Sequence, residues 1–166
     1  VLRSDNALAG LEAIRKSGGD LVVGAGTVLT LDHYRAARDA GSEFIVCPGL
    51  VDAIVDQAQA DDIPILPGTI TAGEVQRAYA LGLRQVKFFP ASLAGGVPML
   101  KALGSVFRDM HFMPTGGISA RNLGDYLALP HVLACGGSWL TPKDADPAHI
   151  EKLAREALAI AAEARG

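Results

Sequence analysis

The sequence predicts an α/β protein with the (β/α)8 or TIM barrel fold, and three observations carry this prediction. Short apolar, β-rich runs recur along the chain, and each is followed by a segment with helical periodicity. Nearly every run also ends in Gly, Pro or Thr. Such residues at many strand ends fit loops that converge on one barrel mouth, whereas an open doubly wound sheet would concentrate them at one switch point.

The elements follow in regular order. The predicted strands cover residues 21–27, 44–49, 63–68, 85–91, 111–117 and 132–137. Helices are expected to start near Leu31, Val51, Thr71 and Ser119, and a long helix is expected from Ala148 to Arg165. Thr71 with Glu74 resembles a capping box, Ser119 is a candidate N-cap, and Gly41 and Gly82 fall at helix ends. The whole chain, 1–166, is therefore expected to form a single barrel domain that lacks its first one to two βα units.

Bulk properties narrow the class of partner. The chain has 166 residues, a formal net charge of -3 and no basic block, which disfavours nucleic acid and anionic membranes. No signal peptide or membrane-spanning run is visible, so a cytoplasmic protein is expected. Cys47 and Cys135 lie in apolar runs, where buried free thiols are expected rather than a disulfide.

Lys87 stands in the middle of the predicted strand 85–91. Strand alternation places Lys87 on one face with Gln85 and Phe89, and the apolar Val86 and Phe88 on the other. Lys87 is thus expected to point into the barrel, where desolvation lowers the pKa of its amine and favours Schiff-base formation with a ketone. The alternative is a lysine that extends to the barrel mouth or pairs with a carboxylate.

Glycine-rich loops end the last two predicted strands, with the sequences PTGGIS at 114–119 and GGSWL at 136–140. Main-chain N–H groups in such loops can bind a phosphate, although glycine pairs also make simple turns. Ser138 adds a hydroxyl donor. Arg3 and Thr27 are candidates for a substrate carboxylate, with structural roles as the alternative. Together with Lys87 they outline a site for a phosphorylated 2-keto acid.

The sequence gives little support for a metal site or a Ser/His/Asp catalytic triad. The four histidines, His33, His111, His131 and His149, are scattered without ligand spacing, and no Ser/His/Asp pattern or P-loop is visible. No metal and no cofactor are therefore expected.

The motifs VGAGTVL, PGL, IPILPG, VKFFPAS, PTGGIS and GGSWL, in this order and spacing, resemble those of 2-keto-3-deoxy-6-phosphogluconate (KDPG) aldolases over essentially the whole chain. The resemblance implies a class I aldolase of the Entner–Doudoroff pathway, a (β/α)8 barrel and usually a homotrimer. It implies that Lys87 forms the Schiff base, that Arg3, Thr27, Pro48 and Phe89 bind the pyruvyl part, and that Thr115, Gly116, Gly117 and Ser138 surround the phosphate. KDPG would be cleaved reversibly to pyruvate and glyceraldehyde 3-phosphate.

The sequence departs from this family pattern at the catalytic base. The usual glutamate lies four residues before the arginine matched by Arg3, a position before Val1, and Asp20 and Glu43 sit at strand beginnings. We expect an N-terminal part beyond the sequence, with a deliberate fragment or completion by another segment as alternatives. Cleavage of 4-hydroxy-2-oxoglutarate or a related 2-keto acid is the second enzymatic hypothesis. A catalytically impaired fragment that only binds pyruvate or phosphate is the third.

Overall fold

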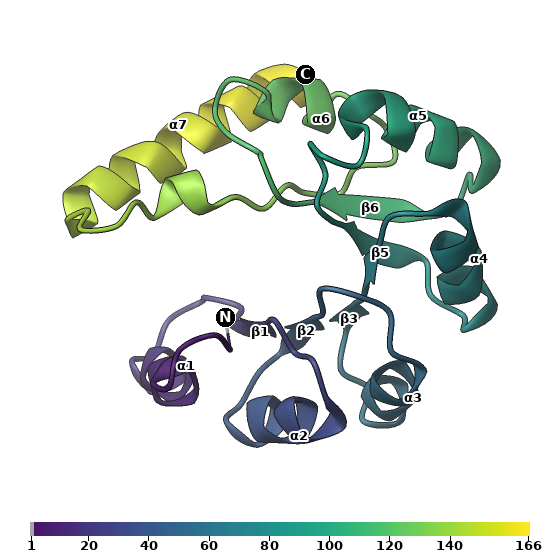
Figure 1. The fold of residues 1–166 in the computed structure, drawn as a ribbon. Helices are drawn as coiled ribbons and strands as arrows, with labels where there is room; N and C mark the ends of the chain where they lie inside the picture. The colour runs from purple at the N-terminus through teal and green to yellow at the C-terminus, as the bar shows by residue number, and fades with distance from the viewer. Residues whose placement is uncertain (1) are drawn as a thin grey trace. The chain divides into compact units, whose positions relative to one another are not determined.

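A computed structural model describes residues 2–166, in which helices alternate with short strands (Figure 1). The helices are α1 (Ala7–Lys16), α2 (Leu31–Asp39), α3 (Asp52–Ala60), α4 (Ala72–Ala80), α5 (Gly96–Val106), α6 (Leu123–Leu127), the 3-10 helix η1 (Ser138–Leu140) and α7 (Pro147–Arg165). The strands are β1 (Gly24–Gly26), β2 (Phe44–Val46), β3 (Ile65–Leu66), β4 (Gly68–Thr69), β5 (Gln85–Phe88) and β6 (His111–Pro114). The predicted α/β class is confirmed.

The chain divides into two compact units, residues 1–87 and 88–166, which we call unit 1 and unit 2. In unit 1, strands β1, β2 and β3 form a sheet in that order, and both neighbouring pairs are parallel. Helices α1, α2 and α3 lie along one side of this sheet (Figure 1). Strands β4, β5 and β6 are neighbours in a second sheet.

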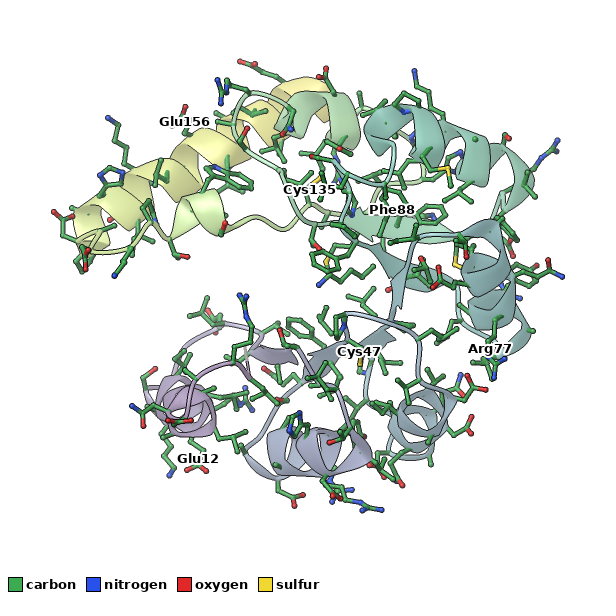
Figure 2. All side chains as sticks on the ribbon, viewed as in Figure 1. Glu12, Cys47, Arg77, Phe88, Cys135 and Glu156 are labelled. Atoms are coloured by element: carbon green, nitrogen blue, oxygen red, sulfur yellow. The ribbon has the colours of Figure 1, made fainter. Side chains whose placement is uncertain are left out.

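The core of unit 1 lies between the sheet and these helices. Its strand residues alternate, so that Ala25, Ile45 and Ile65 are in register and buried while their neighbours along each strand are half-buried. Helix side chains complete the core, among them Leu11, Tyr34, Ile54 and Val55. Cys47 belongs to this cluster as a free thiol (Figure 2). The predicted burial of Cys47 is therefore confirmed, and Cys135 is free but only half-buried.

Helix ends in unit 1 follow the predicted signals. The Thr71 hydroxyl accepts a hydrogen bond from the Glu74 N–H, and the Glu74 carboxylate accepts one from the Thr71 N–H, which completes the capping box. Gly41 and Gly82 directly follow the C-caps of α2 and α4 with φ of +91° and +83°. Glycine adopts this left-handed conformation without steric cost, so both helix stops are confirmed.

The structure does not form the single strand predicted at 63–68. This segment is divided into β3 and β4 at Pro67, which has no N–H to donate to a sheet. A Cβ at Gly68 would overlap the carbonyl oxygen of Pro48, so only glycine permits this close approach of two main-chain segments.

Two predictions for unit 2 need correction. The strand expected at 132–137 is reduced to two isolated parallel bridges, Phe112 to Val132 and Thr115 to Gly136. The helix expected from Ser119 starts later, since Asn122 is the N-cap of α6. Asn122 Oδ1 instead accepts a hydrogen bond from the Ser119 N–H, which holds residues 119–122 in a turn before the helix.

Helix α7 packs against α6 and η1 within unit 2. Arg165 Nη2 donates to the Val132 carbonyl at 3.1 Å and thereby ties the end of α7 to the bridged segment. Within residues 2–166, none of the helices combines the length and apolarity required to cross a membrane.

Candidate active site

Lys87 occupies the position that strand alternation predicts. Val86 and Phe88 are fully buried, Lys87 is half-buried and Gln85 is exposed. The Lys87 N–H donates to the Pro67 carbonyl at 2.9 Å, and the Thr69 hydroxyl donates to the Lys87 carbonyl at 3.2 Å. The main chain of Lys87 is thus fixed from both directions, and its side chain leaves the face opposite Val86.

The surroundings of Lys87 disfavour its charged form. Burial is the largest cause that lowers the pKa of Lys87 below 10.5, and the positive charge of Arg3 lowers it further. A Cys47 thiolate would act in the opposite direction, but burial raises the pKa of Cys47 to about 11, so Cys47 is a neutral thiol at pH 7. A larger fraction of Lys87 is therefore a neutral, nucleophilic amine than in a solvated lysine.

Three further predicted residues of unit 1 lie at strand ends. The Leu2 N–H donates to the Gly26 carbonyl at 2.7 Å, which brings the adjacent Arg3 to the end of β1. Thr27 follows β1 directly, and Pro48 lies two residues after β2. Because β1 and β2 are parallel and in register, their carboxyl ends meet at one edge of the sheet.

Thr27 has a strained main chain, with φ of +63°. A β-branched residue in this region is a genuine outlier, and such strain is concentrated at ligand sites and switches. The strain gives Thr27 a functional signal that its position in the sequence GAGT could not provide.

The two glycine loops of unit 2 lie side by side. Thr115 forms a parallel bridge with Gly136, and the Gly136 N–H donates to the Pro114 carbonyl at 3.0 Å. Gly116 and Gly117 have φ of +90° and +79°, which glycine alone adopts freely. A Cβ at Gly136 would lie 2.8 Å from the Thr115 methyl carbon, so packing between the loops requires glycine there.

The remaining predicted residues have distinct environments within unit 2. The Thr115 hydroxyl is buried and has no hydrogen-bond partner among the described residues. Ser138 is exposed and opens η1, while Phe89 is half-buried and joined to Pro90 by a cis peptide bond. An unpaired buried hydroxyl costs free energy, which a bound acceptor such as a phosphate oxygen would recover.

Sequence reasoning missed Ser92 and Asn122. Ser92 Oγ donates to the Gly117 carbonyl at 3.1 Å, and Asn122 Nδ2 donates to the same oxygen at 2.9 Å. Neither residue is adjacent in sequence to the loop that both contact, so no local pattern indicates their contribution.

The carboxylate of Glu43 lies at the opposite end of the strands from Thr27, as expected. It accepts a hydrogen bond from the Val23 N–H at 2.8 Å and pairs with Arg15 at 2.8 Å, just before β1 and β2 begin. Glu43 thus has a structural role. Within residues 2–166, no group of three or more His, Cys, Asp and Glu side chains is arranged to hold a metal ion.

Comparison with known proteins identifies the family. The family model described as KDPG and KHG aldolase matches residues 1–154. The 2-dehydro-3-deoxy-phosphogluconate aldolase of Pseudomonas aeruginosa is 42% identical over 168 residues, covering 99% of this chain and 76% of the relative. The KHG/KDPG aldolase of Escherichia coli K12 is 44% identical over 161 residues, covering 95% and 76%.

Solved structures agree with these relatives. The KDPG aldolase of Zymomonas mobilis, determined with 3-phosphoglycerate, has a TM-score of 0.92 at 44% identity over 96% of this chain and 76% of the other. The KDPG aldolase of Legionella pneumophila, captured with pyruvate as a covalent carbinolamine, has a TM-score of 0.88 at 37% identity over 96% and 78%. The family match covers residues of both units, and the chain therefore belongs to the family of KDPG and KHG aldolases.

Proposed function

We propose that this protein is a class I aldolase that cleaves KDPG reversibly to pyruvate and glyceraldehyde 3-phosphate. The observation that carries the proposal is Lys87, a half-buried amine on β5 with a lowered pKa. The Legionella pneumophila relative, whose structure holds pyruvate as a covalent carbinolamine, supports the same chemistry here.

The proposed reaction starts at the neutral Nζ of Lys87. Nζ attacks the C2 ketone of KDPG to form a carbinolamine, which loses water and gives a protonated imine. The imine accepts the electron pair of the C3–C4 bond as that bond breaks, while a base removes the C4 hydroxyl proton. Glyceraldehyde 3-phosphate leaves, the remaining enamine gains a proton at C3, and water hydrolyses the imine to release pyruvate and the free amine.

Arg3, Thr27, Pro48 and Phe89 are proposed to bind the pyruvyl part. The Arg3 guanidinium can donate two parallel hydrogen bonds to a carboxylate, and its charge already lowers the pKa of Lys87. Thr27 is held at the end of β1 in a strained conformation, which supports a role in orienting the substrate.

Thr115, Gly116, Gly117 and Ser138 are proposed to bind the phosphate. Among residues 2–166, the buried Thr115 hydroxyl has no hydrogen-bond partner, and the turn at Gly116 and Gly117 supports an anion-binding arrangement of N–H groups. Phosphate sites in (β/α)8 barrels are commonly built from the loops after the last two strands.

We further propose that the strands belong to a (β/α)8 barrel and that the protein is a cytoplasmic homotrimer. The parallel order of β1, β2 and β3 with an intervening helix at each step supports the barrel, and the resemblance to family members supports the trimer. Light scattering with size-exclusion chromatography tests the trimer, and a monomeric mass at micromolar concentration would contradict it.

The deciding experiment mixes the protein with pyruvate, uses borohydride to reduce the imine that forms, and locates the adduct by peptide mass spectrometry. An adduct on Lys87, with turnover of KDPG in a coupled pyruvate assay, is the expected result. Faster turnover of 4-hydroxy-2-oxoglutarate than of KDPG would instead favour the phosphate-free substrate. Absence of an adduct on Lys87 would contradict the Schiff-base mechanism and favour a role in binding alone.

A further inference from the structure

The loop Thr115–Gly117 has an ordered set of main-chain hydrogen bonds on one side. The Ala91 N–H donates to the Thr115 carbonyl at 2.8 Å, and the Ser92 N–H donates to the Gly116 carbonyl at 3.1 Å. The Gly117 carbonyl accepts from Ser92 Oγ at 3.1 Å and from Asn122 Nδ2 at 2.9 Å. Three successive carbonyl groups are therefore occupied by partners.

Because peptide groups are planar, the directions of these carbonyls determine the directions of the neighbouring N–H groups. In a trans peptide, the carbonyl of one residue and the N–H of the next point in opposite directions. The three carbonyls point toward their donors, so the N–H groups of Gly116, Gly117 and Ile118 point away from those donors. Successive main-chain N–H groups in a turn can form a concave anion site.

The third peptide differs from the first two in what orients it. Main-chain N–H groups hold the Thr115 and Gly116 carbonyls, whereas the donors to the Gly117 carbonyl among residues 2–166 are the side chains of Ser92 and Asn122. Asn122 also accepts the Ser119 N–H at 2.8 Å, so its amide spans the loop from Gly117 to Ser119. The direction of the Ile118 N–H therefore depends on the identity of two side chains.

We propose that Ser92 and Asn122 are positioning residues that aim the Ile118 N–H at the phosphate of the substrate and so contribute to selectivity for a phosphorylated 2-keto acid. The inference rests on the proposed phosphate-binding role of this loop. Ser92 is exposed, and its side chain contacts the loop through a single hydroxyl. Removal of this hydroxyl therefore changes what holds one peptide, while the main-chain bond from the Ser92 N–H to the Gly116 carbonyl is kept and the core of unit 2 stays closed.

The test compares the wild-type protein with Ser92→Ala and Asn122→Asp. Ser92→Ala removes one of the two donors to Gly117, and we expect the Kd for inorganic phosphate and the KM for KDPG to rise about threefold to tenfold. Asn122→Asp keeps the acceptor for the Ser119 N–H, loses the donor and adds a negative charge, so a rise of about tenfold or more is expected. The kcat for a phosphate-free 2-keto-4-hydroxy acid should stay within about twofold of wild type, since the bonds removed hold the loop proposed to bind the phosphate, which this substrate lacks.

Two further variants separate positioning from general structure. Ser92→Thr keeps the hydroxyl and should restore phosphate affinity. Ser105→Ala removes a comparable exposed bond, from Ser105 Oγ to the Ala102 carbonyl at 2.8 Å in α5, and should change nothing.

The outcomes also separate the inference from the proposed function. Phosphate binding by wild type that Ser92→Ala and Asn122→Asp leave unchanged would overturn the positioning role alone. A wild-type protein that forms the pyruvate adduct on Lys87 but does not bind phosphate would overturn the role of the loop and, with it, this inference. Equal losses for phosphorylated and phosphate-free substrates would assign Ser92 a structural role instead.

Discussion

The candidate site residues of unit 1 and unit 2 are proposed to contribute to the reaction by different means. In unit 1 the candidate residues are proposed to act through side chains, namely the guanidinium of Arg3 and the half-buried amine of Lys87, and the pKa of Lys87 depends on burial and neighbouring charge. In unit 2 the glycine loops are proposed to act through main-chain N–H groups and the hydroxyls of Thr115 and Ser138, none of which ionises at neutral pH. A reactive group can thus be tuned by its surroundings, whereas a binding loop must be shaped by conformation.

Replacement of Lys87 tests this comparison most severely. Lys87→Met keeps an unbranched side chain of similar length but removes the nucleophile, so kcat for KDPG cleavage should fall by at least about 10³-fold. Phosphate affinity should be retained, because the loops of unit 2 are unchanged. A coupled pyruvate assay and phosphate titration measure the two effects.

Lys101 provides the matched control for this substitution. It is an exposed lysine on α5, and Lys101→Met should keep wild-type turnover and adduct formation. Adduct formation on another lysine in Lys87→Met would show that the site is less specific than the burial of Lys87 indicates.

A change in unit 2 should produce the converse pattern. Gly117 has φ of +79°, and a Cβ there would overlap Ser92 Oγ, so Gly117→Ala must shift the loop. Left-handed strain of roughly 1–2 kcal/mol corresponds to a loss of phosphate affinity of about tenfold. The pyruvate adduct on Lys87 should form as in wild type.

Gly124→Ala is the control for this glycine. Its Cβ would lie 3.7 Å from Ile160 Cγ2, an ordinary contact, so phosphate affinity should be unaffected. Loss of the Lys87 adduct in Gly117→Ala would contradict the separation between side-chain and main-chain chemistry.

The strand pattern could be predicted because it depends on local alternation and on stop signals. Val86, Lys87 and Phe88 have the predicted burial, and the capping box at Thr71 forms as its sequence indicates. The loss of regular pairing at 132–137 could not be predicted, since the two isolated bridges there are made with Phe112 and Thr115, which are distant in sequence. The start of α6 was misplaced because Ser119 and Asn122 are both good caps, and hydrogen bonding in the folded loop favours Asn122.

The candidate site was predictable to a similar degree. Lys87 could be found because a lysine between two buried residues is unusual. The sequence could not predict the strain at Thr27, because it arises from main-chain conformation. Nor could it predict the bonds of Ser92 and Asn122 to Gly117, because these residues are separated in sequence.

The two units should also differ in their dependence on pH. Adduct formation with pyruvate requires neutral Lys87, so its rate should rise with pH and reach its midpoint below 10.5. Phosphate binding should vary only with the ionisation of the phosphate itself, near pH 6 for a monoester. Lys87 loses its proton at a lower pH in the folded state than in the unfolded state. The free energy of unfolding should therefore increase as pH rises from the folded pKa of Lys87 toward 10.5. A rate midpoint at or above 10.5 would contradict the activation of Lys87 by burial.

The smallest expected effect concerns stability in unit 1, where α2 and α3 are joined by a polar network. The buried Tyr34 hydroxyl donates to Asp61 at 2.8 Å, and Arg38 and Gln57 each donate to the same carboxylate at 3.0 Å. Tyr34→Phe removes one of these three bonds and should lower the free energy of unfolding by about 1 kcal/mol, measured by urea denaturation at pH 7.

Acid should weaken the same network, because protonation of Asp61 removes its negative charge. The Tyr34 hydroxyl, followed by Arg38, lowers the pKa of Asp61 below 3.8, so the network stabilises the fold above this pH and is lost as pH falls through the folded pKa. In Tyr34→Phe the pKa of Asp61 should be less depressed, and acid unfolding should begin at higher pH. Hydrogen exchange should place the change in α2 and α3, whereas Tyr126→Phe in unit 2 should leave their protection intact. Equal acid sensitivity in both variants would mean that α2 and α3 are held by their apolar core rather than by Asp61.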